Sequence, residues 1–188
     1  MRIVGGELRG RLVKTPSGAE TRPTSDRARE AVFNILEHAA WSPGIEGSRI
    51  IDLFAGSGAM GLEALSRGAG ACLFVERTEA ALACIRANVE AFGLGPRTRL
   101  LRQDATRLAR RLDDEAPFDL ALLDPPYGQG LGETALMALH AGGWFAEGAV
   151  VVLERGADEG PLTLPGFGLI DERRYGAASV AFLSPSAP

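Results

Sequence analysis

Strand-like and helix-like segments alternate along most of the chain, and this alternation restricts the fold more than any other feature of the sequence. Short apolar runs typical of buried strands are separated by stretches whose apolar residues recur at helical spacing. The predicted strands are residues 49–55, 71–76, 97–103, 118–123 and 149–154. The predicted helices are one from Ser25 or Asp26 to Ala39, and those at 59–67, 79–92, 105–112 and 132–141. Such alternation predicts an α/β fold, a parallel sheet with helices on both faces.

The two ends of the chain depart from this pattern. Residues 2–14 are typical of a two-stranded hairpin, and residues 167–175 and 178–183 predict a terminal hairpin around Gly176. We expect the five residues after Leu183 to be loose. At 188 residues, the chain is predicted to consist of an N-terminal hairpin and arm at 1–24 and one larger domain at 25–188.

The sequence contains no sign of membrane insertion or metal binding. No apolar stretch approaches the roughly 18 residues of a membrane span, and the first six residues lack the features of a signal peptide. Cys72, in a strand pattern, and Cys84, in a helix pattern, are therefore expected to be buried thiols of a cytoplasmic protein. They and the isolated His38 and His140 have no metal-ligand spacing, so we predict no metal and no membrane partner.

Positive charge is concentrated at the start of the chain. The formal net charge is −4, yet residues 1–29 contain seven basic and three acidic residues, a net +4 that leaves −8 for the remainder. A basic arm on an acidic body is consistent with contact to nucleic acid, and a solvated basic hairpin is the alternative. A second group of basic residues is interpreted as a solvated face in preference to an RNA contact. It comprises Arg97, Arg99, Arg102, Arg107, Arg110 and Arg111.

The tetrapeptide Asp124-Pro125-Pro126-Tyr127 follows a predicted strand and carries the most specific chemistry in the sequence. Two consecutive prolines hold φ near −65° and donate no backbone hydrogen bond, so the segment is stiff. It fixes the Asp124 carboxylate and the Pro125 carbonyl as two acceptors beside the ring of Tyr127. An exocyclic amine offers two N–H donors on a flat base, so the pattern favours methylation of a nucleobase amine over an ordinary proline turn.

The sequence Asp52-Leu53-Phe54-Ala55-Gly56-Ser57-Gly58-Ala59-Met60-Gly61 predicts a second binding element, between the first central strand and its helix. Its glycines permit close approach of the backbone to a ligand at the helix N-terminus. Glu76, at the end of the next strand, can accept hydrogen bonds from both hydroxyls of a ribose. The glycine spacing also matches a dinucleotide fingerprint. Asp52 argues against NAD, because it can meet an ammonium group that S-adenosylmethionine has and NAD lacks. A nicotinamide enzyme also leaves the proline tetrapeptide unexplained.

Acidic residues end four successive predicted strands: Asp52, Glu76, Asp104 and Asp124. Ligands of open α/β sheets bind outside the carboxyl ends of the strands, so we expect these side chains to share one site. Asp104 can accept from an adenine amino group while the N–H of Ala105 donates to the ring. An Asp before a helix is also a common cap, so this pair alone is a weak signal.

These motifs together resemble those of class I S-adenosylmethionine-dependent methyltransferases that act on nucleobase amines. More narrowly, residues 1–6 and the segment from Thr21 to Leu36 resemble the bacterial 16S rRNA guanine-N2 methyltransferases of the RsmD family. That segment reads Thr-Arg-Pro-Thr-Ser-Asp-Arg-Ala-Arg-Glu-Ala-Val-Phe-Asn-Ile-Leu. The similarity extends over nearly the whole chain, with no departure at the motif positions.

The resemblance implies a Rossmann-like, seven-stranded sheet with one antiparallel strand near its edge. It also implies methyl transfer from S-adenosylmethionine, leaving S-adenosylhomocysteine, to a loop guanine of 16S rRNA in the small ribosomal subunit. By the same resemblance the catalytic residues are Asp124, Pro125, Pro126 and Tyr127. The implied cofactor-binding residues are Asp52, Phe54, Gly56, Ser57, Gly58, Glu76, Asp104, Ala105, Arg22 and Thr24. Arg22 and Thr24 belong to the family segment that covers the donor, and helix capping is their alternative role.

A mechanism follows as a hypothesis. Asp124 and the Pro125 carbonyl draw the guanine amine out of conjugation with its ring and orient its lone pair toward the methyl group. Two other classes stay open. A DNA adenine-N6 methyltransferase can use the same tetrapeptide, although this chain is small, has an acidic body and lacks an evident recognition domain. A non-catalytic RNA-binding protein on a Rossmann-type scaffold has no need of the intact tetrapeptide. We expect a monomer.

Overall fold

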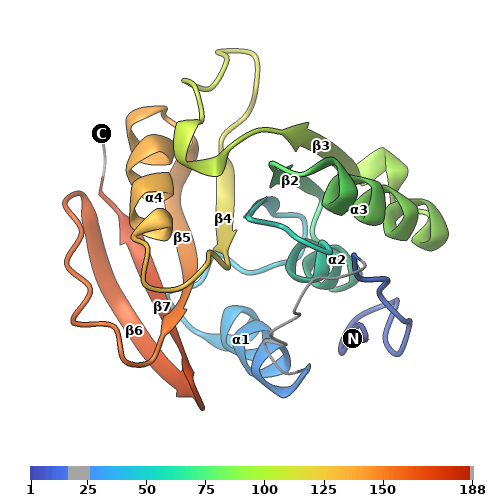
Figure 1. Ribbon diagram of the computed structural model, residues 1–188, viewed down its shortest axis with the longest axis horizontal. Helices are drawn as coiled ribbons and strands as arrows, with labels where there is room; N and C mark the ends of the chain where they lie inside the picture. The colour runs from blue at the N-terminus through green and yellow to red at the C-terminus, as the bar shows by residue number, and fades with distance from the viewer. Residues whose placement is uncertain (17–25, 187–188) are drawn as a thin grey trace.

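Seven strands form one sheet in the structure, a computed structural model that describes residues 1–16 and 26–186. The strands are β1 (Arg49–Leu53), β2 (Ala71–Glu76), β3 (Thr98–Arg102), β4 (Phe118–Leu123), β5 (Phe145–Gly156), β6 (Phe167–Tyr175) and β7 (Ala178–Pro185). Their order across the sheet is β3-β2-β1-β4-β5-β7-β6 (Figure 1). β1 to β5 pair in parallel, and β7 pairs antiparallel with both β5 and β6. The predicted mostly parallel sheet with one antiparallel strand near its edge is confirmed.

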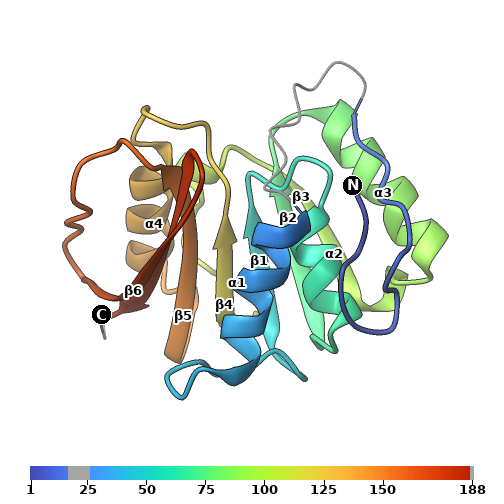
Figure 2. The same ribbon diagram turned by 90° about the horizontal axis from the view of Figure 1, so that it is seen from below.

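Helices cover both faces of the sheet. They are α1 (Asp26–His38), α2 (Ala59–Ser66), α3 (Glu79–Phe92) and α4 (Leu131–Ala141), with short 3-10 turns η1 (Gly95–Arg97) and η2 (Ala105–Arg107). α1, α2 and α3 pack on one face and α4 on the other (Figure 2). Among the described residues, no helix combines the length and apolar character that a membrane crossing requires.

The central strands are buried on both faces, which explains why most of their residues are apolar. In β1, Ile50 belongs to the core beneath α1, α2 and α3, and Ile51 belongs to the core beneath α4. In β4, Leu122 and Leu123 divide between the same two cores. A polar side chain at these positions would be desolvated without a partner, so alternation of polar and apolar residues is absent here.

The strand order reverses at the boundary between β1 and β4. β2 and β3 lie on one side of β1, whereas β4 and β5 lie on the other. The helices that follow β1 and β4, which are α2 and α4, cover opposite faces of the sheet. Their connecting loops therefore diverge at this point, where open α/β sheets form ligand crevices.

The N-terminal segment, residues 1–16, turns back on itself as predicted for a hairpin, but it contains no regular strand. An antiparallel bridge joins Arg2 to Leu12, and the N–H groups of Ile3 and Val13 donate to the carbonyls of Arg11 and Met1 at 3.0 and 3.1 Å. Ile3 and Val13 are almost fully buried in the core shared with α1, α2 and α3. These two side chains therefore attach the segment to the main hydrophobic core.

Beyond the bridge, side chains of α2 and α3 bind the backbone of this segment. The N–H groups of Val4 and Gly5 donate to the carboxylate of Glu63 on α2, each at 2.8 Å. The N–H of Lys14 donates to Asn88 Oδ1 on α3 at 2.9 Å, and Asn88 Nδ2 donates back to the Lys14 carbonyl at 3.0 Å. Because these backbone groups are satisfied by helices, they do not pair with each other in a ladder.

The helix predicted at 105–112 is wrong beyond its first turn, η2. The rest of this stretch bonds to the connection between α4 and β5 instead of to itself. The N–H of Arg111 donates to the Gly142 carbonyl at 3.0 Å, and Trp144 Nε1 donates to the Ala109 carbonyl at 2.9 Å. These contacts join residues more than 30 positions apart, so a local pattern could not indicate them.

Two further expectations are wrong. Of the five residues expected to be loose, 184–186 are not, because β7 continues to Pro185 and the N–H of Ser186 donates to the Gly166 carbonyl at 2.7 Å. Residues 187 and 188 lie outside the described residues. Cys72 is buried as predicted, but Cys84 is only partly buried. The Cys84 thiol donates to the Lys14 carbonyl at 3.1 Å, on the side of α3 that faces the N-terminal segment.

Candidate active site

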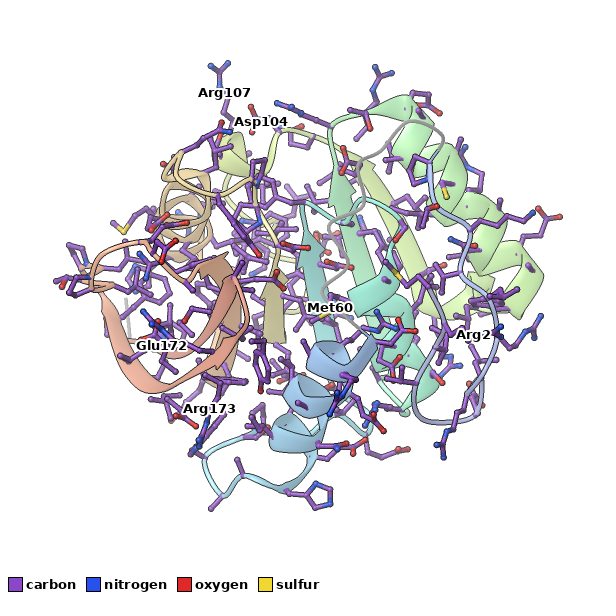
Figure 3. All side chains as sticks on the ribbon, turned by 60° about the horizontal axis from the view of Figure 1, so that its bottom comes forward. Arg2, Met60, Asp104, Arg107, Glu172 and Arg173 are labelled. Carbon is purple, nitrogen blue, oxygen red and sulfur yellow. The ribbon has the colours of Figure 1, made fainter. Side chains whose placement is uncertain are left out.

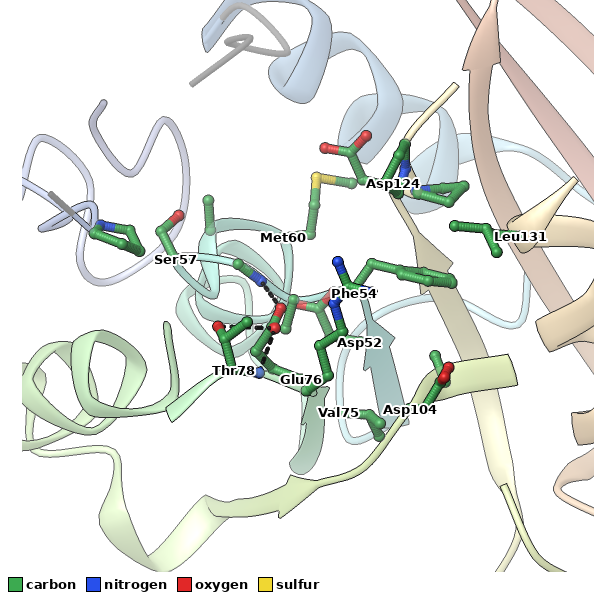
Figure 4. Close-up of a pocket in the computed structure, with 18 of the residues that line it drawn as sticks. Asp52, Phe54, Ser57, Met60, Val75, Glu76, Thr78, Asp104, Asp124 and Leu131 are labelled. Carbon is green, nitrogen blue, oxygen red and sulfur yellow. Dashed lines mark hydrogen bonds between the residues drawn. The ribbon is translucent and has the colours of Figure 1, made fainter. Parts of the chain in front are cut away.

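A cavity of about 650 Å³ lies at the carboxyl ends of the central strands, where the strand order reverses. This volume falls within the range of about 300–1,000 Å³ that is usual for small-molecule sites. The four strand-end acids, Asp52, Glu76, Asp104 and Asp124, all border it (Figure 4). The N-terminal segment and α1 complete the wall with Met1, Pro16 and Arg29. The structure thus brings the four acids to one cavity.

The loop between β1 and α2 turns sharply through residues with left-handed backbone. The φ angles of Phe54, Gly56 and Gly58 are 57°, 55° and 80°. Phe54 is the one non-glycine residue with positive φ among those that the structure describes, and such strained residues cluster at binding sites. Phe54, Gly56 and Ser57 border the cavity. Gly58 instead faces the core, since a Cβ there would lie 3.2 Å from Ile85 Cγ1.

Asp52 is buried at the base of this loop, with 3% of its surface exposed. Its Oδ2 accepts a hydrogen bond from the N–H of Gly61, in the first turn of α2, at 2.9 Å. Burial raises the pKa of the Asp52 carboxyl well above its ordinary value. The bond from Gly61 opposes this shift, and the nearby charges of Asp124 and Glu76 add to it. The ionised form of Asp52 is therefore not fully stabilised by its neighbours, and a bound cation would stabilise it.

Glu76 ties together the loops that follow β1 and β2. Its Oε2 accepts from the N–H of Gly56 at 3.1 Å, and its Oε1 accepts from Thr78 N–H at 2.9 Å and Thr78 Oγ1 at 3.1 Å. Oε1 accepts two of these bonds, whereas Oε2 accepts one and has a second lone pair. The side chain can therefore hold these loops in place and still accept from a ligand hydroxyl through Oε2.

Asp104 ends β3 and caps η2. Its Oδ1 accepts from Thr106 Oγ1 at 2.7 Å and from Thr106 N–H at 2.9 Å, and these bonds lower the pKa of its carboxyl. The capping role that the sequence left open is therefore present. Asp104 and Ala105 also border the cavity. Near Asp104, the side chain of Arg107 projects outward from the molecule (Figure 3).

The tetrapeptide after β4 forms the opposite wall of the cavity. Asp124 and Pro126 are exposed, Pro125 is buried, and Tyr127 is partly buried with its hydroxyl donating to Glu154 Oε1 on β5. All four residues border the cavity. Met60, in the first turn of α2, extends toward Asp124 (Figure 4). The acceptor-rich loop and the glycine loop therefore face a common space.

Several cavity residues lie outside the motifs that the sequence indicated. They are Pro16, Val75, Arg77, Thr78, Thr106, Gln129 and Leu131. Thr78 and Thr106 could have been found, because each lies two positions after a strand-end acid. Met1 and Arg29 lie in segments that carry the family resemblance, but neither was predicted as a site residue; long-range packing brings them and Pro16 to the cavity. Arg22 and Thr24 lie outside the described residues.

The described part of the chain contains no group of three or more His, Cys, Asp or Glu side chains arranged to hold a metal ion. Of the four acids that border the cavity, Asp52, Glu76 and Asp104 each accept at least one hydrogen bond from a nearby backbone N–H.

Comparison with known proteins adds an independent view of the chain. The family described as Conserved hypothetical protein 95 matches residues 1–184. The Bacillus subtilis (strain 168) protein YlbH is 34% identical over 183 residues, which are 96% of this chain and 97% of that protein. The Escherichia coli (strain K12) protein named ribosomal RNA small subunit methyltransferase D is 34% identical over 165 residues, 88% of this chain and 79% of that protein. The solved structure of yhhF from Escherichia coli has a TM-score of 0.84 at 32% identity, covering 100% of this chain and 99% of that one.

Proposed function

The chain belongs to the RsmD family of rRNA methyltransferases and has their class I, Rossmann-like fold, and on this premise we propose its reaction. It transfers a methyl group from S-adenosylmethionine to the exocyclic N2 amine of a guanine in 16S rRNA. The substrate is the small ribosomal subunit, assembling or assembled, so the enzyme works in the cytoplasm. It acts as a monomer and without a metal ion.

The residues of the cavity fit S-adenosylmethionine better than a dinucleotide. The donor carries a sulfonium and an ammonium cation, and four carboxyl groups border the cavity, whereas the pyrophosphate of NAD is an anion that they would repel. Glu76 would hold the ribose hydroxyls and Asp52 the ammonium group. Asp104 and the N–H of Ala105 would hold the adenine edge. When bound, the donor supplies a methyl group activated by its positively charged sulfur.

One observation carries the proposal: the tetrapeptide Asp124–Tyr127 borders the same cavity as Glu76 and Asp104. An amine held by the tetrapeptide would therefore meet a donor held by the glycine loop. The Asp124 carboxylate and the Pro125 carbonyl would accept the two N–H groups of the amine and free its lone pair from the ring. Orienting that lone pair in line with the methyl group supplies much of the rate enhancement.

The transfer itself needs little acid–base assistance. The new nitrogen–carbon bond forms as the sulfur–carbon bond breaks, leaving S-adenosylhomocysteine. The methylated amine is then acidic and loses its proton to Asp124 or to water. The guanine must first leave its stack, at a cost of roughly a few kcal/mol, and stacking on Tyr127 would return about 1–3 kcal/mol.

Substitution of Asp124 tests the catalytic assignment. Asp124→Ala is expected to lower the turnover number by at least about 100-fold, because both the orientation of the amine and its proton acceptor are lost. Affinity for S-adenosylmethionine, measured by calorimetric titration, should change little. Asp113→Ala is the matched control, since Asp113 is exposed and does not border the cavity. Normal turnover by Asp124→Ala would contradict the assignment.

The substrate is identified by nucleoside mass spectrometry. The protein and labelled S-adenosylmethionine are incubated in parallel with unmethylated small subunits, naked 16S rRNA and duplex DNA. We expect N2-methylguanosine in the ribosomal samples, and the ratio of subunits to naked RNA would show which is the true substrate. Methyladenine in the DNA alone would instead identify the chain as a DNA adenine-N6 methyltransferase. If no sample is labelled but the protein binds S-adenosylmethionine, it acts on a different substrate. If it does not bind S-adenosylmethionine, it is a non-catalytic protein.

A further inference from the structure

The tetrapeptide is stiff where it begins and flexible where it ends. Its two prolines fix φ at Pro125 and Pro126. Beyond Tyr127 the chain turns through Gly128 and Gly130, whose φ angles are 70° and 64°. Glycines in this left-handed region rotate more freely than other residues. The orientation of Asp124 and Tyr127 therefore depends on what holds the loop at Gly128.

Glu159 holds the loop at that point. Its Oε1 accepts hydrogen bonds from the N–H of Gly128 at 3.1 Å and from the N–H of Gly156, at the end of β5, at 2.9 Å. One carboxylate oxygen thus joins the loop after β4 to the end of the neighbouring strand. Hydrogen bonds to a charged acceptor are stronger than those to a neutral one.

Arg155 keeps Glu159 in place. The Arg155 side chain is almost fully buried, and its Nη2 lies 3.6 Å from Glu159 Oε2. It also donates to the Gly160 carbonyl at 3.0 Å and lies 3.7 Å from Glu133 Oε1 on α4. The Glu159 carboxylate therefore has a buried cation on one oxygen and two backbone donors on the other.

Glu154 provides a second contact, to the aromatic ring of the tetrapeptide. It is buried on β5 with 7% exposure, and its Oε1 accepts the hydrogen bond of the Tyr127 hydroxyl. Gly156 lies beside that ring, because a Cβ there would be in van der Waals contact with Tyr127 Cδ2 at 3.4 Å. The end of β5 therefore contacts both the ring of Tyr127 and the backbone that follows it.

We propose that Glu154 and Glu159 are positioning residues for methyl transfer. Glu159 pins the flexible end of the tetrapeptide loop through Gly128, and Glu154 sets the orientation of the Tyr127 ring on which the base stacks. Neither residue touches the amine or the methyl group. This inference rests on the proposed function for its catalytic consequence, although the pinning of the loop can be measured without turnover.

The test compares two substitutions of Glu159 with one of its neighbour. Glu159→Ala removes the shared acceptor, whereas Glu159→Gln keeps an amide oxygen that can accept from both N–H groups. Asp158→Ala is the control, because Asp158 is adjacent and exposed. Each protein is measured for hydrogen exchange of the Gly128 and Gly156 amides by NMR, for S-adenosylmethionine affinity by calorimetry, and for kcat and KM on the RNA substrate.

For Glu159→Ala we expect amide exchange at Gly128 and Gly156 to accelerate by about tenfold and kcat to fall by a similar factor, as loss of a charge-assisted hydrogen bond predicts. Donor affinity should stay within about twofold, since the donor-binding loops are on the other side of the cavity. Glu159→Gln should recover most of kcat, and Asp158→Ala should behave as wild type. The same comparison applies to Glu154→Ala and Glu154→Gln, with the NMR ring signals of Tyr127 in place of amide exchange.

Unchanged exchange at Gly128 in Glu159→Ala would overturn the proposal. So would a fall in kcat that Glu159→Gln does not recover, or one that donor affinity follows in parallel, because either indicates general structural damage. If the wild-type protein methylates no RNA, the proposed function fails, and the exchange rates still decide whether Glu159 holds the loop.

Discussion

At the residue scale, Asp52 shows how ligand binding and stability oppose each other in this site. Its carboxyl is buried beneath the glycine loop, and burial together with Asp124 and Glu76 raises its pKa. In the folded chain the ionised form is therefore less favourable than in the unfolded chain. A group with a raised folded-state pKa stabilises the fold below its unfolded pKa, and this contribution is lost as pH rises through the folded value.

Asp52→Asn should therefore make the free protein more stable at neutral pH. The amide oxygen can still accept from Gly61 N–H, while the cost of a buried charge disappears. We expect thermal unfolding to shift upward by a few degrees at neutral pH, with the difference shrinking in acid, where Asp52 is protonated. Calorimetric unfolding across pH measures this, and a lower unfolding temperature at neutral pH would contradict it.

Donor binding should show the opposite dependence on Asp52. An ammonium group beside the carboxyl favours its ionised form, so binding to the wild-type protein should release protons and strengthen as pH rises through the raised pKa of Asp52. Titrations in two buffers with different ionisation enthalpies measure that release. Asp52→Asn should bind S-adenosylmethionine more weakly and release fewer protons. Equal proton release by both proteins would mean that another group responds to the ligand.

At the scale of elements, sequence periodicity was sufficient for the central sheet. β2, β4 and α3 begin and end where the pattern predicts, because their apolar residues are dictated by burial on one or both faces. The stretch after η2 was not predictable, and neither was the docking of the N-terminal hairpin on α2 and α3, since these backbone groups bond to distant elements. The C-terminal residues 184–186 were missed for the same reason.

The residues of the candidate site were likewise predictable only where local sequence or sheet topology places them. Residues that end strands could be placed together from topology alone, and Asp52, Glu76, Asp104 and Asp124 do border one cavity. Gly58 was predicted from its motif to contact the ligand. The structure gives another reason for the glycine, because a side chain there would crowd Ile85. Arg29 and Met1 reach the cavity through tertiary contacts. A local pattern cannot reveal such contacts because it contains no information on docking between helices and termini.

Glu63 on α2 anchors the N-terminal segment, and its loss should detach that element. It is fully buried, accepts from Val4 and Gly5, and pairs with Arg67 Nε at 2.8 Å and Arg29 Nε at 3.5 Å. Glu63→Ala leaves two buried cations without this carboxylate, so we expect a loss of about 3–5 kcal/mol in the free energy of unfolding.

Glu37→Ala serves as the control for Glu63→Ala. It removes another carboxylate that pairs with Arg67, at 3.0 Å, but Glu37 is partly exposed. It should cost no more than about 1 kcal/mol. Chemical denaturation of both variants gives the comparison. Similar costs for the two substitutions would mean that the buried carboxylate does not anchor the segment.

At the scale of the whole molecule, an acidic protein must present its positive charge selectively to bind RNA. The net charge is −4, and several cations already have partners: Arg97 pairs with Glu7, and Arg86 and Arg102 both pair with Glu79. On the N-terminal segment, Arg9 and Lys14 are exposed and make no ion pair with a described carboxylate. A cation without an ion-pair partner has no such pair to break when it binds phosphate. This segment is therefore the better candidate for the RNA contact.

The double substitution Arg9→Gln and Lys14→Gln should accordingly weaken RNA binding and its dependence on salt. Each lost phosphate contact should reduce the slope of log affinity against log salt concentration by about 0.7–0.9. Donor affinity should not change, because neither side chain borders the cavity. Arg86→Gln with Arg102→Gln removes the same charge from cations paired with Glu79, and it should leave the slope nearly unchanged. If both double variants reduce the slope equally, net charge rather than the N-terminal segment governs binding, and the RNA must approach the cavity over a broader surface.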